Sequence, residues 1–301
     1  MRNLADAITT EKLTKSYGER RGVFDLDLSV PEGAIFGFLG PNGAGKTTTI
    51  RLLLDLIRPA SGRALVFGHD CRKEAKLVHR MTGYLPGEFA LDPKLSGRQL
   101  LTYLGNLRGG VDWTFVEAMA RSLELELDRP FRVYSRGNKQ KVGLVQAFMH
   151  RPPLLILDEP TGGLDPLNQD AVLTLVREAR AEGATVFFSS HILSEVEEVC
   201  DDVAFIREGR LVRSGPVQEL LRAKGHTVEA ECSLPADAAA FAHLRGVSQV
   251  EAAGARISFH VQGDMREALN VLARFEPAAL VSREPSLAEI FARLYEGEEA
   301  P

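Results

Sequence analysis

The sequence predicts an α/β fold, in which helices cover a mostly parallel sheet and a smaller α+β module follows. Two observations predict it. Over about the first 220 residues, short apolar runs alternate with helical patterns, and this order is typical of parallel strands that are joined by helices. After residue 223 the pattern becomes βαββαβ with a trailing helix, which matches a small ferredoxin-like module.

Length and composition agree with two domains. The chain has 301 residues, of which 45% are hydrophobic and 26% are charged, so a sizeable core is expected and global disorder is excluded. We predict one domain over residues 1–223 and an accessory domain over residues 224–301. Residues 86–150 are largely helical in pattern and resemble a subdomain inserted between two strand-rich parts.

Buried strands and one capped helix define the first domain. Pro166 opens a helical pattern over Leu167–Ala181, and Asp165 is a good N-cap for it because proline suits the first helical position. The expected strands are apolar runs bounded by turn residues. They are Ala34–Leu39, Leu154–Leu157 and Thr185–Phe188.

The second domain has shorter elements. The expected strands are His226–Cys232, Val247–Glu251, Ile257–Val261 and Ala278–Ser282. The expected helices are Ala236–Leu244, Met265–Phe275 and Ser286–Tyr295.

Charge and cysteine content narrow the class of protein. The net charge is −5 and the pI is about 5.9, which argues against a protein that mainly neutralises nucleic-acid phosphates. Three scattered cysteines fit a reducing compartment better than a disulfide scaffold or a zinc site. The first 15 residues show no signal peptide, and no run approaches the roughly 18 apolar residues that span a bilayer.

A glycine-rich loop carries the clearest chemistry. It follows the expected strand Ala34–Leu39 and precedes a helix expected over Thr48–Leu56, and this context supports a phosphate-binding GxxxxGK[ST] motif. The backbone N–H groups of such a loop surround phosphates, the Lys46 ammonium reaches the β- and γ-phosphates, and the Thr47 hydroxyl binds Mg²⁺. The loop residues are Gly40, Pro41, Asn42, Gly43, Ala44, Gly45, Lys46, Thr47 and Thr48.

Two carboxylates end the strand Leu154–Leu157. Asp158 and Glu159 are therefore expected at the carboxyl edge of the sheet, where α/β proteins bind ligands. We expect Asp158 to bind Mg²⁺, directly or through water, and Glu159 to orient or polarise an attacking water.

These motifs together resemble the ATPase subunits of ATP-binding-cassette transporters, from Ile8 to about Ala223. Tyr17 lies where that family stacks an aromatic ring on adenine. Gly163-Leu164-Asp165 resembles the loop that crosses between paired subunits, with Asp165 near the nucleotide. His191 matches the switch histidine that contacts the γ-phosphate, and it is predicted to act with Glu159 in catalysis.

The resemblance implies a P-loop NTPase cassette with a RecA-like core and an inserted helical subdomain. It implies an ATPase that uses ATP and Mg²⁺ to power export of a drug, an antibiotic or a lipid-like substrate through a separately encoded membrane permease. Such a subunit is cytoplasmic and binds the inner face of the cell membrane through that permease. Drug- and antibiotic-export branches of the family also carry a small C-terminal extension.

The signature segment departs from the family pattern Leu-Ser-Gly-Gly-Gln, because it reads Tyr134-Ser135-Arg136-Gly137-Asn138. The retained Ser135 and Gly137 are expected to contact the nucleotide bound by a facing subunit. Arg136 adds bulk and charge; it is either a further phosphate contact or, as we favour, a solvated side chain.

A second departure concerns the family's magnesium-sensing glutamine. Gly87 occupies the expected position in Tyr84-Leu85-Pro86-Gly87-Glu88. Glu88, one residue on, is a candidate replacement ligand for Mg²⁺.

Other charged residues are assigned to the surface. Lys139 and Lys141 are expected on a solvated helix face, and so are the acidic residues of Ser194–Val199. Ser194 and Glu197 fit a capping box.

One phosphate loop cannot complete the family's paired site, so we expect a dimer, either with a second copy or with another ATPase subunit. Three alternatives stay open: a regulator that binds ATP but barely hydrolyses it, a soluble cassette protein acting on ribosomes or DNA, and an importer ATPase. A GTPase is disfavoured because no Asn-Lys-x-Asp motif is present, and no nucleic-acid partner is expected.

Overall fold

The computed structural model describes residues 5–18, 21–88, 92–222, 225–284 and 286–296. The chain divides into two compact units, Met1–Ser214 and Gly215–Pro301. The domain boundary expected at residues 223 and 224 lies outside the described residues.

A six-stranded sheet forms the centre of the first unit, with the strand order β10-β9-β3-β8-β7-β6. The neighbours from β9 to β6 are parallel, which confirms the predicted parallel sheet. Each of the three predicted strands is present. The strands are β3 (Ile35–Leu39), β6 (Thr82–Leu85), β7 (Leu154–Asp158), β8 (Thr185–Ser190), β9 (Asp202–Arg207) and β10 (Arg210–Pro216).

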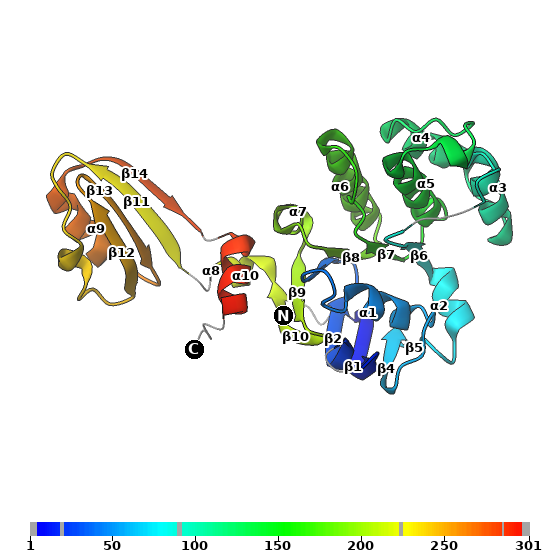
Figure 1. Ribbon diagram of the computed structural model, residues 1–301, viewed down its shortest axis with the longest axis horizontal. Helices are drawn as coiled ribbons and strands as arrows, with labels where there is room; N and C mark the ends of the chain where they lie inside the picture. The colour runs from blue at the N-terminus through cyan, green and yellow to red at the C-terminus, as the bar shows by residue number, and fades with distance from the viewer. Residues whose placement is uncertain (1–4, 19–20, 89–91, 223–224, 285, 297–301) are drawn as a thin grey trace. The chain divides into compact units, whose positions relative to one another are not determined.

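A second, antiparallel sheet in this unit was not predicted. Its strand order is β2-β1-β4-β5. The helix α1 (Lys46–Leu53) contacts β2 and β4 of this sheet and β7 of the other, so it lies between the two sheets (Figure 1). The strands are β1 (Asp6–Ser16), β2 (Gly22–Pro31), β4 (Ser61–Val66) and β5 (His69–Asp70).

The observed range of α1 begins and ends earlier than the predicted one. We expected Thr48–Leu56, but the helix begins at Lys46 and ends at Leu53. It begins earlier because Gly45 adopts φ +114° directly before it, a conformation that glycine takes without steric cost. It ends earlier because Asp55 also adopts a left-handed backbone, with φ +50°.

The described part of the first unit contains six further α-helices. The predicted helix is confirmed as α6, with Asp165 as N-cap and Pro166 at its first position. In Figure 1, α3, α4 and α5 are grouped beyond β6 and β7, and all three lie within residues 86–150, where helices were expected. The helices are α2 (Ala75–Met81), α3 (Gly97–Leu107), α4 (Trp113–Ser122), α5 (Arg136–Phe148), α6 (Pro166–Ala181) and α7 (Leu193–Val199).

Aromatic packing holds β3 against β8. The ring centroids of Phe36 and Phe187 are 5.9 Å apart, and those of Phe38 and Phe187 are 5.3 Å apart. All three side chains are buried. This packing fixes the two strands whose carboxyl ends lead into the glycine-rich loop and to His191.

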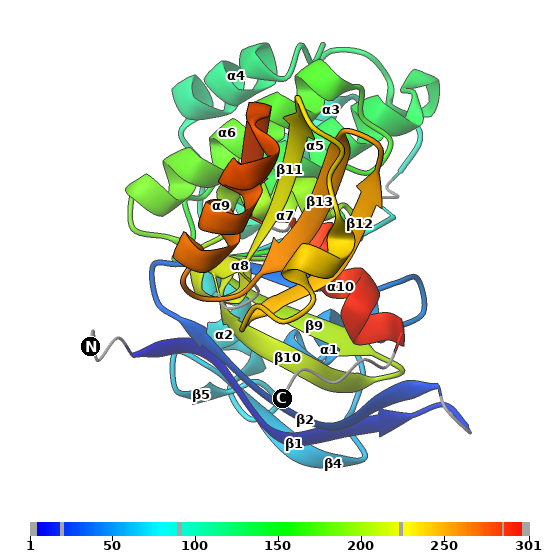
Figure 2. The same cartoon turned by 90° about the vertical axis from the view of Figure 1, so that its left-hand side faces the viewer.

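The second unit contains a four-stranded antiparallel sheet in the order β12-β13-β11-β14. Figure 2 shows β11, β13 and β12 side by side. This is the ferredoxin-like arrangement that we predicted. The strands are β11 (His226–Cys232), β12 (Val247–Ala253), β13 (Arg256–Val261) and β14 (Pro277–Arg283); the helices are α8 (Val217–Arg222), α9 (Arg266–Leu272) and α10 (Leu287–Glu296).

The first helix of this module is shorter than expected. In place of an α-helix over Ala236–Leu244, a 3-10 turn spans Ala238–Phe241. Asp237 caps the turn, and the Phe241 ring packs on Phe259 with centroids 4.9 Å apart. A single tight turn therefore already buries Phe241.

Candidate active site

The glycine-rich loop connects β3 to α1, as the sequence predicted. A side chain at Gly40 would place its Cβ 2.4 Å from the carbonyl oxygen of Ile206, so the strand can pass this point only with glycine. Gly43 and Gly45 adopt φ values of +82° and +114°. These left-handed residues turn the chain into the first turn of α1, whose N–H groups face the loop.

Lys46 extends back over this loop and is only 5% exposed. Its Nζ donates hydrogen bonds to the carbonyl oxygens of Gly40 and Pro41, at 2.7 and 3.3 Å. The same atom is 3.6 Å from Glu159 Oε1. Burial lowers the pKa of Lys46, while the carboxylates of Glu159 and Asp158 oppose that shift. The ammonium thus lies between the loop and the acidic end of β7.

Thr47 and Asp158 form the oxygen pair that the sequence suggested. The Thr47 hydroxyl donates to Asp158 Oδ2 at 2.8 Å. The other oxygen, Oδ1, accepts from the Ser189 hydroxyl at 2.6 Å. Asp158 is 1% exposed, so these contacts hold its carboxylate in one orientation. Ser189, at the end of β8, is a site residue that sequence reasoning missed.

Glu159 has the most constrained backbone of the site. It adopts φ +52°, an uncommon conformation for a residue with a side chain. Its N–H group donates to the Ser189 carbonyl oxygen and lies 3.2 Å from the Ser189 hydroxyl. The turn directs the Glu159 carboxylate toward Lys46 on one side and His191 on the other, where Nδ1 is 3.4 Å away. The predicted catalytic pair therefore lies together.

Gln140 is a second residue that sequence reasoning missed. It lies on α5, is buried, and its Nε2 donates to the carbonyl oxygens of Glu159 and Pro160 at 3.1 and 3.4 Å. It therefore links α5, the helix that begins within the signature segment, to the backbone of Glu159. In the sequence, the only feature that points to this role is the position of Gln140, two residues after Asn138 at the end of the signature segment.

The signature residues lie at the N-terminus of α5. The Ser135 hydroxyl caps the helix by accepting from Asn138 N at 3.1 Å. Among the described residues, no hydrogen bond or ion pair joins Ser135 to Lys46, Asp158 or Glu159. Gly137 instead lies beside Gly163, since a Cβ at Gly137 would be 3.2 Å from the Gly163 carbonyl oxygen.

Arg136 and Asp165 lie around the same segment. The Arg136 side chain is exposed and lies over Gly163, at 3.5 Å from the position of a Cβ there. Asp165 uses its carboxylate to cap α6, with Asn168 N at 3.1 Å and Asn168 Nδ2 at 2.7 Å. These hydrogen bonds lower the pKa of Asp165.

Tyr17 presents an exposed ring. It is 55% exposed, and Lys15 Nζ lies 5.6 Å from the ring centroid. No hydrogen bond, ion pair or ring contact within the described residues links Tyr17 to the glycine-rich loop. Its adenine-binding role stays a prediction.

Gly87 lies next to the oxygen pair. A Cβ at this position would be 3.3 Å from Asp158 Oδ2, so a side chain here would face the same place that a bound metal would occupy. Glu88 differs, because it lines a hollow with Leu54, His79 and Arg108. Among the described residues it makes no hydrogen bond or ion pair with Thr47 or Asp158.

The structure corrects two surface assignments and one predicted helix cap. Lys141 is 6% exposed, because α5 packs between β6 and the neighbouring helices. Glu195 is also 6% exposed, under the turn that carries His191. Ser194 is not an N-cap: α7 begins at Leu193, and Ile192 precedes it without a side-chain cap.

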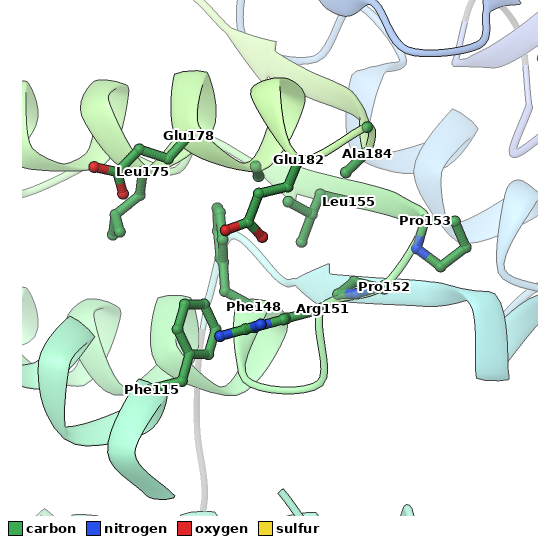
Figure 3. A pocket seen from close by; sticks show the side chains of 12 residues that line it. Phe115, Phe148, Arg151, Pro152, Pro153, Leu155, Leu175, Glu178, Glu182 and Ala184 are labelled. Atoms are coloured by element: carbon green, nitrogen blue, oxygen red, sulfur yellow. The ribbon is translucent and has the colours of Figure 1, made fainter. Parts of the chain in front are cut away.

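A separate pocket of about 590 Å³ lies between α4, α5 and α6, near the start of β7 (Figure 3). Phe115, Phe148, Leu155 and Leu175 supply apolar surface, and Glu178 lies on the opposite wall from Arg151. None of the predicted site residues lines it. Because β7 carries Asp158 at its other end, this pocket is distinct from the candidate active site.

The described residues contain no group of three or more His, Cys, Asp or Glu side chains that could hold a metal ion. A metal at Thr47 and Asp158 would therefore need oxygens from a ligand or from water. In the same part of the chain, no helix is both long and apolar enough to cross a membrane.

Together, the site combines an anion-binding loop, a buried ammonium, an oxygen pair and a carboxylate next to an imidazole. Such an arrangement can bind a chain of phosphates and place a water against the terminal one.

Comparisons with known proteins agree with this chemistry. The family model described as ABC transporter matches residues 23–162. The bacitracin transport ATP-binding protein BcrA of Enterococcus faecalis is 40% identical over 71% of this chain and 70% of its own. A daunorubicin resistance ATP-binding protein of Streptomyces coeruleorubidus is 35% identical over 96% of this chain and 95% of its own.

Solved structures show the same fold. The ATP-binding subunit of an ABC transporter superposes with a TM-score of 0.66 at 30% identity, over 72% of this chain and 92% of that chain. An ATP-binding cassette in a dimeric state after hydrolysis, bound to ADP and phosphate, has a TM-score of 0.63 at 21% identity, over 70% of this chain and 98% of that chain. The latter likeness shows the fold alone.

Proposed function

Because the chain belongs to the ABC transporter family, as an ATP-hydrolysing subunit, we propose that it powers export of an antibiotic-like or drug-like compound through a separate permease. The observation that carries the ATPase assignment is the contact of Glu159 with both Lys46 and His191, beside the Thr47–Asp158 pair. The names of the relatives, which refer to bacitracin and daunorubicin, support the class of compound.

Each side chain has a definite task in this proposal. Lys46 exchanges its bonds to loop carbonyls for bonds to the β- and γ-phosphates, which are stronger because both partners are charged. Glu159 orients a water against the γ-phosphate and accepts its proton, and His191 contacts the oxygens of the departing phosphate. The constrained backbone of Glu159 keeps the carboxylate facing the reaction.

Thr47 and Asp158 supply the kind of ligand atom that Mg²⁺ binds. Magnesium prefers oxygen ligands and is commonly held by one or two protein groups together with substrate phosphates, and Thr47 Oγ1 and Asp158 Oδ2 are such a pair, 2.8 Å apart. When bound, the ion would neutralise negative charge on the phosphates. Gly87 contributes no ligand, so water would complete the shell unless Glu88 turns away from the hollow that it lines.

The second half of each site comes from another subunit in this proposal. Among the described residues, Ser135 and Gly137 have no hydrogen bond to Lys46 or Asp158 of their own chain, whereas they lie at a helix N-terminus, which favours anions. Two cassettes that face each other would bring this helix end to the partner's γ-phosphate. ATP would then join the subunits, and hydrolysis would release them.

We place the permease contact in a hollow of about 440 Å³ between the core and the helical segment. Leu56 is 53% exposed there, and Tyr84 and Pro86 connect the hollow to Gly87. A permease segment docked here would be sensitive to movement next to Asp158. Through this contact the subunit would bind the inner face of the cell membrane.

The decisive experiment uses Glu159→Gln. The amide keeps the shape of the side chain but cannot accept a proton, so the variant should bind ATP without hydrolysing it and stay in a closed dimer. The mass of the purified variant in solution is measured with and without ATP and Mg²⁺, next to ATP hydrolysis by the wild type.

A dimer that forms only with ATP, together with hydrolysis that the substitution abolishes, would support a homodimeric motor. A variant that binds ATP but stays a monomer would show that another ATPase subunit completes the site. A wild type that binds ATP without hydrolysing it, even with its permease, would contradict the proposed function.

A further inference from the structure

Glu195 is a buried acid that the proposed reaction does not use. It lies in the first turn of α7 and is 6% exposed. The helix lies close to β3, because Gly37 has no side chain: a Cβ there would be 2.6 Å from Val196 Cγ1. This close packing keeps water away from the carboxyl, and burial is the main reason that the pKa of Glu195 is raised.

One oxygen of Glu195 supports the turn that carries His191. The Ser190 hydroxyl donates to Glu195 Oε2 at 3.2 Å. Ser190 Oγ in turn accepts from the N–H group of Ile192 at 2.9 Å. The same hydroxyl is 3.3 Å from the Ile192 carbonyl oxygen, which shares its proton with Glu195. Ser190 and Ile192 flank His191, so this hydroxyl connects Glu195 to both ends of the turn.

The other oxygen has no such bond. Glu195 Oε1 is buried and has no hydrogen bond of good geometry with any described residue, although the Thr161 hydroxyl is near enough to lower the pKa of the carboxyl. Thr161 is two residues after Glu159, and its carbonyl oxygen accepts from Leu164 N at 3.1 Å. It therefore belongs to the loop that leads to Gly163 and Asp165.

We propose that Glu195 is a positioning residue that links the turn of His191 to the loop of Thr161. Leaving a buried carboxylate oxygen without a donor is unfavourable, so a small movement of Thr161 that completes this bond is favoured. Subunit closure, which the proposed function requires, displaces the neighbouring Gly163–Asp165 loop. Closure thereby completes the bond to Glu195 and holds His191 in place against Glu159.

The first test separates positioning from nucleotide binding. Glu195→Ala should lower the kcat of ATP hydrolysis by about tenfold or more, because misplacing a catalytic group by about 1 Å can cost 100-fold, and should leave the KM for ATP within about twofold. Glu195→Gln should restore most of the kcat, since the amide still offers an acceptor to Ser190 and a donor to Thr161. Glu197→Gln, on the exposed face of the same helix, is the matched control and should behave as the wild type.

The second test examines the link itself. Thr161→Val and Ser190→Ala each remove one hydroxyl, and each should lower kcat. Either one combined with Glu195→Ala should cost little more than Glu195→Ala alone, because all three changes break one network. If Glu195→Ala does not fold, Thr161→Val and Ser190→Ala still test whether the link exists. Each of them changes the side chain only slightly, so both are expected to fold.

The pH dependence adds a readout that a purely structural role would not change. His191, Glu198 and Cys200 are the titratable groups that act on or near Glu195. A shift of the acid limb of kcat in Glu195→Gln that is absent from Glu197→Gln supports the proposal.

The outcomes are distinguishable from those of the proposed function. A wild type that hydrolyses ATP together with an unchanged kcat for Glu195→Ala or Thr161→Val would overturn the link and leave the ATPase assignment intact. Full additivity of the double variants would overturn it as well. A wild type without ATPase activity would contradict the proposed function, and with it this inference.

Discussion

Glu159 illustrates how much of the site depends on the conformation of single residues. Its φ of +52° is what directs a carboxylate at the end of a strand sideways, between an ammonium and an imidazole. The cost of this backbone is offset by the bonds that Ser189 and Gln140 make to its N–H and carbonyl groups. Substitutions of either supporting residue would therefore act on catalysis without touching the nucleotide.

We expect the protonation of His150 to make the stability of the protein depend on pH. Burial and the nearby Arg108 charge lower its pKa from 6.5 to about 4. Between those values the unfolded chain binds the proton and the folded chain does not. The contribution of His150 to the free energy of unfolding is thus fully present above pH 6.5 and is lost as pH falls toward 4.

We predict that His150→Gln reduces the loss of stability on acidification. From pH 7 to pH 5, the wild type should lose about 1 kcal/mol more than the variant, after allowance for partial solvent exposure. Urea unfolding at both pH values measures this. Parallel pH curves for the two proteins would show that the ring is not protonated on unfolding.

At the scale of elements, α5 and α6 each combine a structural cap with a part of the site. Ser135 caps α5 at the end proposed to face a partner's nucleotide, and Gln140 on the same helix holds the backbone of Glu159. A rotation of α5 would thus displace the backbone of Glu159 and with it the catalytic carboxylate. Asp165 similarly ties α6 to the loop of Gly163.

We predict that Asp165→Ala lowers the free energy of unfolding by about 1 kcal/mol, the usual cost of removing an N-cap. Asp165→Asn should retain nearly all of it, because asparagine caps equally well. Chemical denaturation of the nucleotide-free proteins measures both. Equal stability of Asp165→Ala and the wild type would mean that Pro166 alone sets the start of the helix.

At the scale of the whole molecule, the residues of the proposed site lie in the first of the two units. The ferredoxin-like unit has its own core around Phe241 and Phe259, and the daunorubicin resistance relative aligns with 96% of the chain, so its similarity extends over this unit too. None of the residues proposed for the nucleotide site lies in the sheet of the ferredoxin-like unit.

We predict that a chain ending at Arg222 still binds ATP, with a Kd within about twofold of the full chain, because a domain with its own core folds alone. ATP-driven dimerisation or transport should change instead. Titration with a fluorescent ATP analogue and measurement of the dimer mass test the two parts. A folded truncation that no longer binds ATP would contradict the prediction.

The sequence alone determined the chemistry that contiguous residues carry. The positions of the glycine-rich loop and of the Asp158–Glu159 pair, and the cap of α6, were predicted correctly, because local spacing and strand–helix order are enough to specify them. The parallel sheet and the ferredoxin-like strand order followed from the same patterns. The antiparallel sheet of β1, β2, β4 and β5 was missed, although β2 alternates buried and exposed residues, because its partners come from distant parts of the chain.

Which polar and charged residues are buried became evident only from the packing of the folded chain. Glu195, Lys141 and Gln140 lie in segments whose sequences read as polar helix faces, and nothing local distinguishes them from solvated residues. Their burial depends on how closely α7 and α5 pack on the sheets, which small residues such as Gly37 permit. Desolvation is a property of everything that surrounds a group, so residues far apart in the sequence determine it.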